Sequence, residues 1–199
     1  DTLAVLRAKA RSKSVAMTSR VADDLPPVEG FGGELNQVWA NLIENAYPGQ
    51  DYDDLMSVVD ATIARGSIDT DNLFVTGGSG GGALTAWIVG HTDRFKAGAP
   101  ERFEVDYLSA FGTDEWHSQY VTELGTPWEN AERYRELSPI TTVSSIKTPL
   151  LLITNENDGN CPPTQAMQHY TRLKQLGVPT EPVIYPDASQ KAAHFIQLC

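Results

Sequence analysis

The spacing of apolar and polar residues predicts that helices and strands alternate along most of the chain. Apolar residues three and four positions apart favour amphipathic helices, and short apolar runs bounded by turn residues favour buried strands. Residues 101–147 show neither pattern and are expected to be irregular. We expect helices over residues 34–46, 51–66, 80–91, 163–177 and 189–199, and strands over residues 72–77, 95–100, 148–158 and 180–186.

The order of these elements indicates a fold class. From residue 51 onward a helix is followed by a strand, and the pair is repeated. Consecutive strands joined by helices run parallel, and such sheets are usually covered by helices on both faces. The pattern therefore predicts an α/β protein with a mostly parallel sheet.

Composition and charge narrow the classes of function. The chain has 199 residues, of which 41% are hydrophobic and 21% are charged, as in globular proteins. A formal net charge of -11 disfavours nucleic acid as a partner, and no apolar run is long enough to span a membrane. Cys161 and Cys199 form neither a disulfide framework nor a metal-ligand set, so we expect no metal, no cofactor and a cytoplasmic location.

Glycines surround one serine, in the pattern G-x-S-x-G, between an expected strand and an expected helix. Gly77-Gly78-Ser79-Gly80-Gly81 fits a nucleophile elbow, in which small residues let a strained turn expose the serine hydroxyl. The backbone N–H of Gly80 and the start of the helix would stabilise an oxyanion. A phosphate-binding loop is disfavoured because no G-K-[ST] ending follows. Glycines that serve only close packing are the other reading.

A serine nucleophile needs a base, and the base needs an orienting carboxylate. In this arrangement the acid and then the histidine follow the serine along the chain. Asp158 directly follows the strand at 148–158, with Glu156 as its competitor, and an ordinary turn residue is the alternative role. His194 is the single histidine after the last expected strand and is the candidate base. The earlier histidines are expected to serve packing or to lie at the surface: His91, His117 and His169.

Several motifs in series resemble the catalytic domain of the prolyl oligopeptidase family of serine peptidases, especially its acylaminoacyl-peptidase-like members. They include "YPGQDYDDLMSVVDATIARGSIDTDNLFVTGGSGGGALTAWIVGHTDRFKAG", "GTPWENAERYRELSPI" and "KTPLLLITNENDGNCPPTQAMQHYTRLKQLGVPTEPVIYPDAS". The resemblance covers about residues 40–190. It implies an α/β-hydrolase fold, Ser79 as the nucleophile, Asp158 as the triad acid, and a peptide or acyl-peptide substrate.

The sequence departs from the family pattern in three respects. Gln190 stands where the family usually has the histidine, and glutamine cannot act as a general base. The family's early strands with an "HGGP"-type loop, and its β-propeller, have no counterpart among these residues. A sheet without its early strands would expose an edge, which favours self-association into a homo-oligomer.

The first part of the chain resembles part of the ATP-binding domain of sensor histidine kinases. "NQVWANLIENA" is similar to the N-box of that family, which would make Asn41 and Asn45 contacts of nucleotide or Mg²⁺, although no D-x-G-x-G box follows. A plain amphipathic helix is the other reading. We therefore divide the chain into a histidine-kinase-like or unassigned segment, residues 1–46, and a truncated hydrolase domain, residues 47–199. A fragment or a chimera would explain the junction.

These observations support three functions. The first is a serine peptidase with a triad of Ser79, Asp158 and His194. The second is a catalytically impaired hydrolase-fold protein that serves binding or assembly. The third is a nucleotide-binding fragment.

Overall fold

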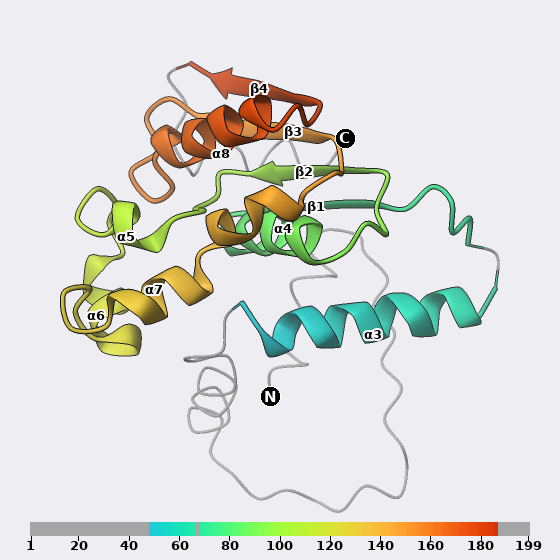
Figure 1. Ribbon diagram of the computed structural model, residues 1–199, viewed down its shortest axis with the longest axis horizontal. Helices are drawn as coiled ribbons and strands as arrows, with labels where there is room; N and C mark the ends of the chain where they lie inside the picture. The colour runs from blue at the N-terminus through green and yellow to red at the C-terminus, as the bar shows by residue number, and fades with distance from the viewer. Residues whose placement is uncertain (1–47, 67, 187–199) are drawn as a thin grey trace, which may run out of the picture. The chain divides into compact units, whose positions relative to one another are not determined.

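The computed structural model describes residues 48–66 and 68–186, and these residues are built around a parallel sheet (Figure 1). Four strands within this part of the chain are hydrogen-bonded in the order β1-β2-β3-β4, and every neighbouring pair is parallel. Their carboxyl ends therefore lie along one edge of the sheet. The strands are β1 (Phe74–Gly78), β2 (Ala97–Glu101), β3 (Leu150–Asn155) and β4 (Thr180–Tyr185).

The helices before and between the strands follow the sequence expectation, except in the connection between β2 and β3. The helices expected over residues 51–66, 80–91 and 163–177 are confirmed as α3 (Gln50–Ala64), α4 (Gly80–His91) and α8 (Pro163–Gln175). All four expected strands are confirmed to within a few residues. The expected α/β class with a parallel sheet is thus confirmed, and the arrangement is that of an α/β-hydrolase.

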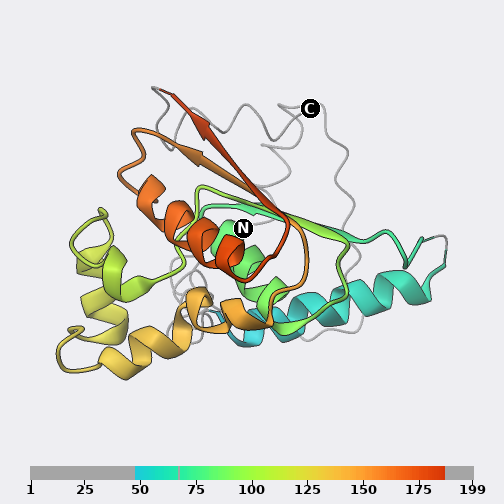
Figure 2. The same ribbon diagram turned by 45° about the horizontal axis from the view of Figure 1, so that its top comes forward.

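The expectation that residues 101–147 are irregular is wrong. This connection between β2 and β3 contains α5 (Tyr107–Ala110), α6 (His117–Leu124), α7 (Ala131–Leu137) and the 3₁₀ helix η1 (Pro139–Ser145). The longest of the three α-helices has 8 residues. Little more than two turns is too short for an apolar period to stand out. Figure 2 shows α5, α6 and α7 gathered beyond the carboxyl ends of the strands.

Helices α4 and α8 pack on the same face of the sheet. Leu150 and Leu152 of β3 belong to one buried apolar cluster with residues of both helices. On the opposite face, the side chains of Phe74 and Leu151 are exposed. The helix residues of the cluster are Ala86 and Val89 of α4 and Ala166 and Leu173 of α8.

Several sequence expectations concern residues outside the described part. The helices expected over residues 34–46 and 189–199, the histidine-kinase-like segment with Asn41 and Asn45, the division of the chain at residue 46 and the absence of early strands all stay predictions. The described residues all belong to one unit, Asn45–Cys199.

Candidate active site

Ser79 lies at a sharp turn between the end of β1 and the start of α4. Its backbone has φ 58° and ψ -126°, in a region that residues with a side chain rarely occupy. The Ser79 N–H donates to the carbonyl oxygen of Glu101 on β2 at 2.9 Å, which ties the turn to the neighbouring strand. The serine therefore directly precedes a helix, whose N-terminus carries a partial positive charge.

Two of the glycines near Ser79 are required by close backbone contacts. A Cβ atom on Gly77 would lie 2.4 Å from the carbonyl oxygen of Gly81, and one on Gly82 would lie 2.6 Å from the carbonyl oxygen of Glu101. A Cβ atom on Gly81 would meet no heavy atom within 4 Å. Close packing thus explains Gly77 and Gly82, whereas position 81 has room for a methyl group.

Asp158 lies in the loop after β3 and is buried, with 3% of its surface exposed. Its Oδ1 accepts hydrogen bonds from the N–H groups of Asn160 (3.0 Å) and Cys161 (2.9 Å), so the loop holds the carboxyl group in place. Burial raises the pKa of Asp158, and the two N–H donors and the charge of Arg102 oppose this rise. The competing acid, Glu156, is exposed.

The sheet topology brings Ser79 and Asp158 to the same edge. Ser79 follows β1 and Asp158 comes shortly after β3, and β2 is the one strand between them. Two strand spacings of about 4.8 Å separate the chains by about 10 Å.

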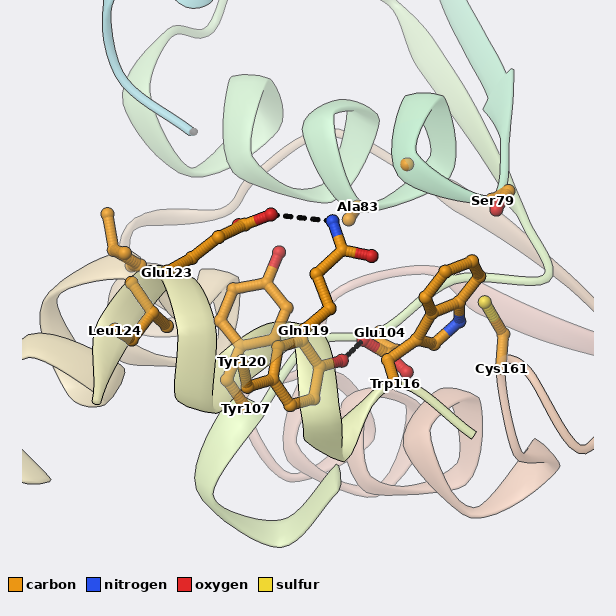
Figure 3. A pocket seen from close by; sticks show the side chains of 12 residues that line it. Ser79, Ala83, Glu104, Tyr107, Trp116, Gln119, Tyr120, Glu123, Leu124 and Cys161 are labelled. Atoms are coloured by element: carbon orange, nitrogen blue, oxygen red, sulfur yellow. Dashed lines mark hydrogen bonds between the residues drawn. The ribbon is translucent and has the colours of Figure 1, made fainter. Parts of the chain in front are cut away.

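A cavity of ≈ 220 Å³ opens beside Ser79. This volume lies below the roughly 300–1,000 Å³ of sites for drug-sized ligands, and it suits a single side chain. Figure 3 shows Ser79 on one side of the cavity and aromatic and acidic side chains from the connection between β2 and β3 on the other. The lining residues are Ser79, Gly80, Ala83, Glu104, Tyr107, Trp116, Gln119, Tyr120, Glu123, Leu124, Leu137 and Cys161.

Two carboxyl groups share the hydroxyl of a tyrosine that lines this cavity. The hydroxyl of Tyr120 contacts Glu104 Oε2 and lies 2.9 Å from Asp114 Oδ2. Burial, followed by the neighbouring Asp114, raises the pKa of Glu104 to about 9. Burial and the two carboxyl groups also raise the pKa of Tyr120. Sequence reasoning missed these three residues because they lie in the stretch expected to be irregular.

The described histidines have positions outside this cavity. His91 ends α4 and stacks on Trp87 with ring centroids 4.2 Å apart, and His117 begins α6 with an exposed side chain. His169 of α8 is fully buried, with an edge contact to Phe103. His194, the candidate base, lies outside the described residues, as do Gln190 and Cys199. The catalytic histidine therefore stays a prediction.

Two further properties of the described residues concern membranes and metal ions. Within residues 48–66 and 68–186, no helix combines the length and the apolar character needed to cross a bilayer. In the same part of the chain, His, Cys, Asp and Glu side chains form no group of three or more that could hold a metal ion.

Comparisons with known proteins agree on one family. The model of the prolyl oligopeptidase family matches residues 29–194. The uncharacterized peptidase YuxL of Bacillus subtilis is 38% identical over 171 residues, which are 80% of this chain and 24% of that protein. Dipeptidyl-peptidase 5 of Porphyromonas gingivalis is 32% identical over 175 residues, which are 84% of this chain and 25% of that protein.

The solved structures that resemble this fold point the same way. The acylaminoacyl peptidase of Pyrococcus horikoshii superimposes with a TM-score of 0.75 at 27% identity, over 79% of this chain and 26% of that one. The chain thus spans about a quarter of the length of the relatives that it matches.

Proposed function

Because the chain belongs to the prolyl oligopeptidase family, we propose that it carries the nucleophile and the acid of a serine peptidase that cleaves peptide or acyl-peptide bonds. The observation that carries this proposal is the backbone of Ser79, with φ 58° at the carboxyl edge of a parallel sheet and beside a cavity. Strained backbone costs free energy and persists mainly where function needs it. The relatives named as a dipeptidyl-peptidase and an acylaminoacyl peptidase support the substrate class.

In the proposed reaction, Ser79 Oγ attacks the carbonyl carbon of the substrate while a histidine takes its proton. The negative charge that develops on the carbonyl oxygen is stabilised by the N–H of Gly80 and the N-terminus of α4. The leaving amine receives the proton from the histidine as the acyl-enzyme forms. Water, deprotonated by the same histidine, then releases the acyl group and restores Ser79.

We assign Asp158 the role of orienting that histidine and stabilising its charged form. Its burial and the two N–H donors on Oδ1 fix the carboxyl group at the edge where Ser79 also lies. The sequence leaves His194 as the candidate base. The imidazole would lie between the turns that carry Ser79 and Asp158, which follow strands about 10 Å apart.

A second candidate function is binding or assembly without catalysis. The sequence favours it at one position, because Gln190 stands where the family resemblance implies the histidine. The exposed side chains of Phe74 and Leu151 on one sheet face also suit a protein contact.

Labelling of the full chain with a fluorescent fluorophosphonate tests the first function against the second. We expect labelling of the wild type, none of Ser79→Ala, and a strong loss in His194→Ala. His91→Ala, with the same change at the end of α4, serves as the matched control and should label like the wild type. Absence of Ser79-dependent labelling in folded protein would refute catalysis and favour binding. Unchanged labelling of His194→Ala would remove His194 as the base.

A further inference from the structure

We propose that the cavity beside Ser79 receives a positively charged side chain, that of lysine or arginine, from the acyl part of the substrate, and that Glu104 binds its charge. This proposal rests on the proposed function, because it takes Ser79 as the nucleophile. A residue whose carbonyl carbon is attacked by Ser79 places its own side chain next to that serine, and this cavity is lined by Ser79 and Gly80.

The first argument is the state of the Glu104 carboxyl group. Glu104 lines the cavity although only 7% of its surface is exposed. Its Oε2 contacts the hydroxyl of Tyr120, whereas its buried Oε1 has no hydrogen-bond partner among the described residues. A buried carboxyl oxygen without a donor is costly, and an ammonium or guanidinium group would supply the donor.

The second argument is the shortage of donors around Tyr120. Its hydroxyl has one hydrogen and lies between the carboxyl groups of Glu104 and Asp114. A single hydroxyl hydrogen can serve only one of them at a time. In the empty cavity the proton that Glu104 keeps is the second hydrogen, and a bound cation would replace that proton as the donor to Glu104.

The third argument is the composition of the cavity wall. The twelve described residues that line it include two acids, Glu104 and Glu123, and none of the twelve is a lysine, arginine or histidine. Three aromatic residues complete the wall, and aromatic faces attract cations. Figure 3 shows Glu123 joined to Gln119 on the side towards α4, away from Glu104. The three aromatic residues are Tyr107, Trp116 and Tyr120.

The segment that carries Glu104 is held firmly enough for recognition. Gln165 of α8 is fully buried, and its Oε1 accepts hydrogen bonds from the N–H groups of Val105 (3.1 Å) and Asp106 (3.0 Å). Because these are the two residues after Glu104, the carboxyl group is positioned by the core and not by a free loop.

A cation in this cavity would be linked to a proton. Tyr120, Asp114 and Asp158 face Glu104, and its pKa of about 9 means that the carboxyl group keeps its proton at neutral pH in the empty cavity. A bound cation favours the carboxylate and so releases this proton. As the pH rises from about 6 to about 9, the carboxylate becomes easier to form, and the preference for a charged side chain should increase.

The experiment compares substrates that differ only in charge. Ester or amide substrates with lysine and its neutral analogue norleucine, and with arginine and its neutral analogue citrulline, are given to the full chain. At about pH 9, where the Glu104 carboxylate forms readily, we expect kcat/KM to favour the charged member of each pair by about ten- to a hundredfold, the size of one hydrogen bond to a charged group. We expect Glu104→Gln to reduce this ratio to near one.

Control variants separate Glu104 from general electrostatics. Glu181→Gln makes the same substitution at an exposed position on β4 and should keep the wild-type ratio. Glu123→Gln should lower the ratio only slightly. Equal rates for lysine and norleucine in the wild type would overturn the proposal, as would loss of the preference in Glu123→Gln but not in Glu104→Gln. An unchanged melting temperature of Glu104→Gln shows that the variant is folded. If the variant does not fold, the comparison of lysine and norleucine substrates in the wild type decides the proposal.

The cation site can be tested separately from the proposed function. If the fluorophosphonate does not label Ser79, the proposed catalytic function is refuted but the cation site is not. Binding of N-acetyl-lysine amide and N-acetyl-norleucine amide to Ser79→Ala, followed by NMR, then decides the cavity. Tighter binding of the lysine compound that is lost on adding Glu104→Gln supports the cation site, and equal binding refutes it.

Discussion

Replacement of Gly82 by alanine tests the steric role of the glycines around Ser79. The added Cβ atom would lie 2.6 Å from the carbonyl oxygen of Glu101 and 2.8 Å from Phe103 Cβ. Unstrained carbon contacts are about 3.5–4.0 Å. Both neighbours are close to the backbone of the next strand, so neither can move aside like the end of a flexible side chain. Gly81→Ala is the matched control, because a Cβ atom there meets nothing within 4 Å.

The two variants share one favourable contribution. Both positions lie in the first turn of α4, where alanine is favoured over glycine by up to about 1 kcal/mol. Forcing an extra methyl group into packed structure costs about 1–3 kcal/mol. Because the helix contribution is common to both variants, the difference between them measures the steric cost. We expect Gly82→Ala to be less stable than Gly81→Ala by about 1–3 kcal/mol.

The assay is unfolding in urea followed by circular dichroism, with fluorophosphonate labelling as a second measurement. The carbonyl oxygen of Glu101 also accepts the hydrogen bond from the Ser79 N–H. A shift of Glu101 away from position 82 would therefore move the serine, and Gly82→Ala should label more slowly than Gly81→Ala. Equal stability of the two variants, within about 0.5 kcal/mol, would refute the steric account.

Two further predictions concern buried polar side chains. Burial, and then the charge of Arg172, lowers the pKa of His169 to about 4. The unfolded imidazole takes up its proton near pH 6.5, so the free energy of unfolding should fall by about 2 kcal/mol between pH 7 and pH 5 through this residue. Protonation of Glu104 changes the free energy of unfolding in the opposite direction, so the contribution of His169 is isolated by comparing the wild type with His169→Leu in urea unfolding at both pH values. The assignment would be contradicted if the free energy of unfolding changed equally in the two proteins between pH 7 and pH 5. Gln165→Leu leaves the N–H groups of Val105 and Asp106 without their acceptor and should cost about 2–4 kcal/mol in urea unfolding. Gln168→Leu loses one side-chain hydrogen bond to Ser109 and should lower the free energy of unfolding by less than about 1 kcal/mol. An equal decrease in both variants would contradict the role given to Gln165.

The sequence predicts well the parts of the fold in which neighbouring residues form a regular apolar pattern. The strand before Ser79 and helix α4 after it are visible as an apolar run and a run of small and apolar residues. The turn between them can be predicted from the glycines, because the close backbone contacts at Gly77 and Gly82 leave no room for a larger residue. Asp158 is predictable because it follows a buried strand, and its burial distinguishes it from Glu156.

The parts that the sequence does not predict depend on contacts between distant positions. Glu104, Asp114 and Tyr120 are separated by 10 and 6 residues, longer than the two residues in a strand or the three or four in a helix that place neighbours on one face. Gln165, which holds the segment after Glu104, is a further 45 residues along the chain from Tyr120. Short helices with few turns bring them together, and their positions are set by packing and not by local preference.

This difference in origin has a consequence for how the site would change by mutation. The turn at Ser79 is fixed by backbone contacts within β1, β2 and α4, where even a methyl group at position 82 collides with its neighbours. Most of the cavity wall comes instead from residues 104–137, in short helices beyond the edge of the sheet. Substitutions in those helices do not touch the contacts that strain Ser79. They should therefore change which side chain the cavity accepts while the reactivity of Ser79 towards a small fluorophosphonate persists.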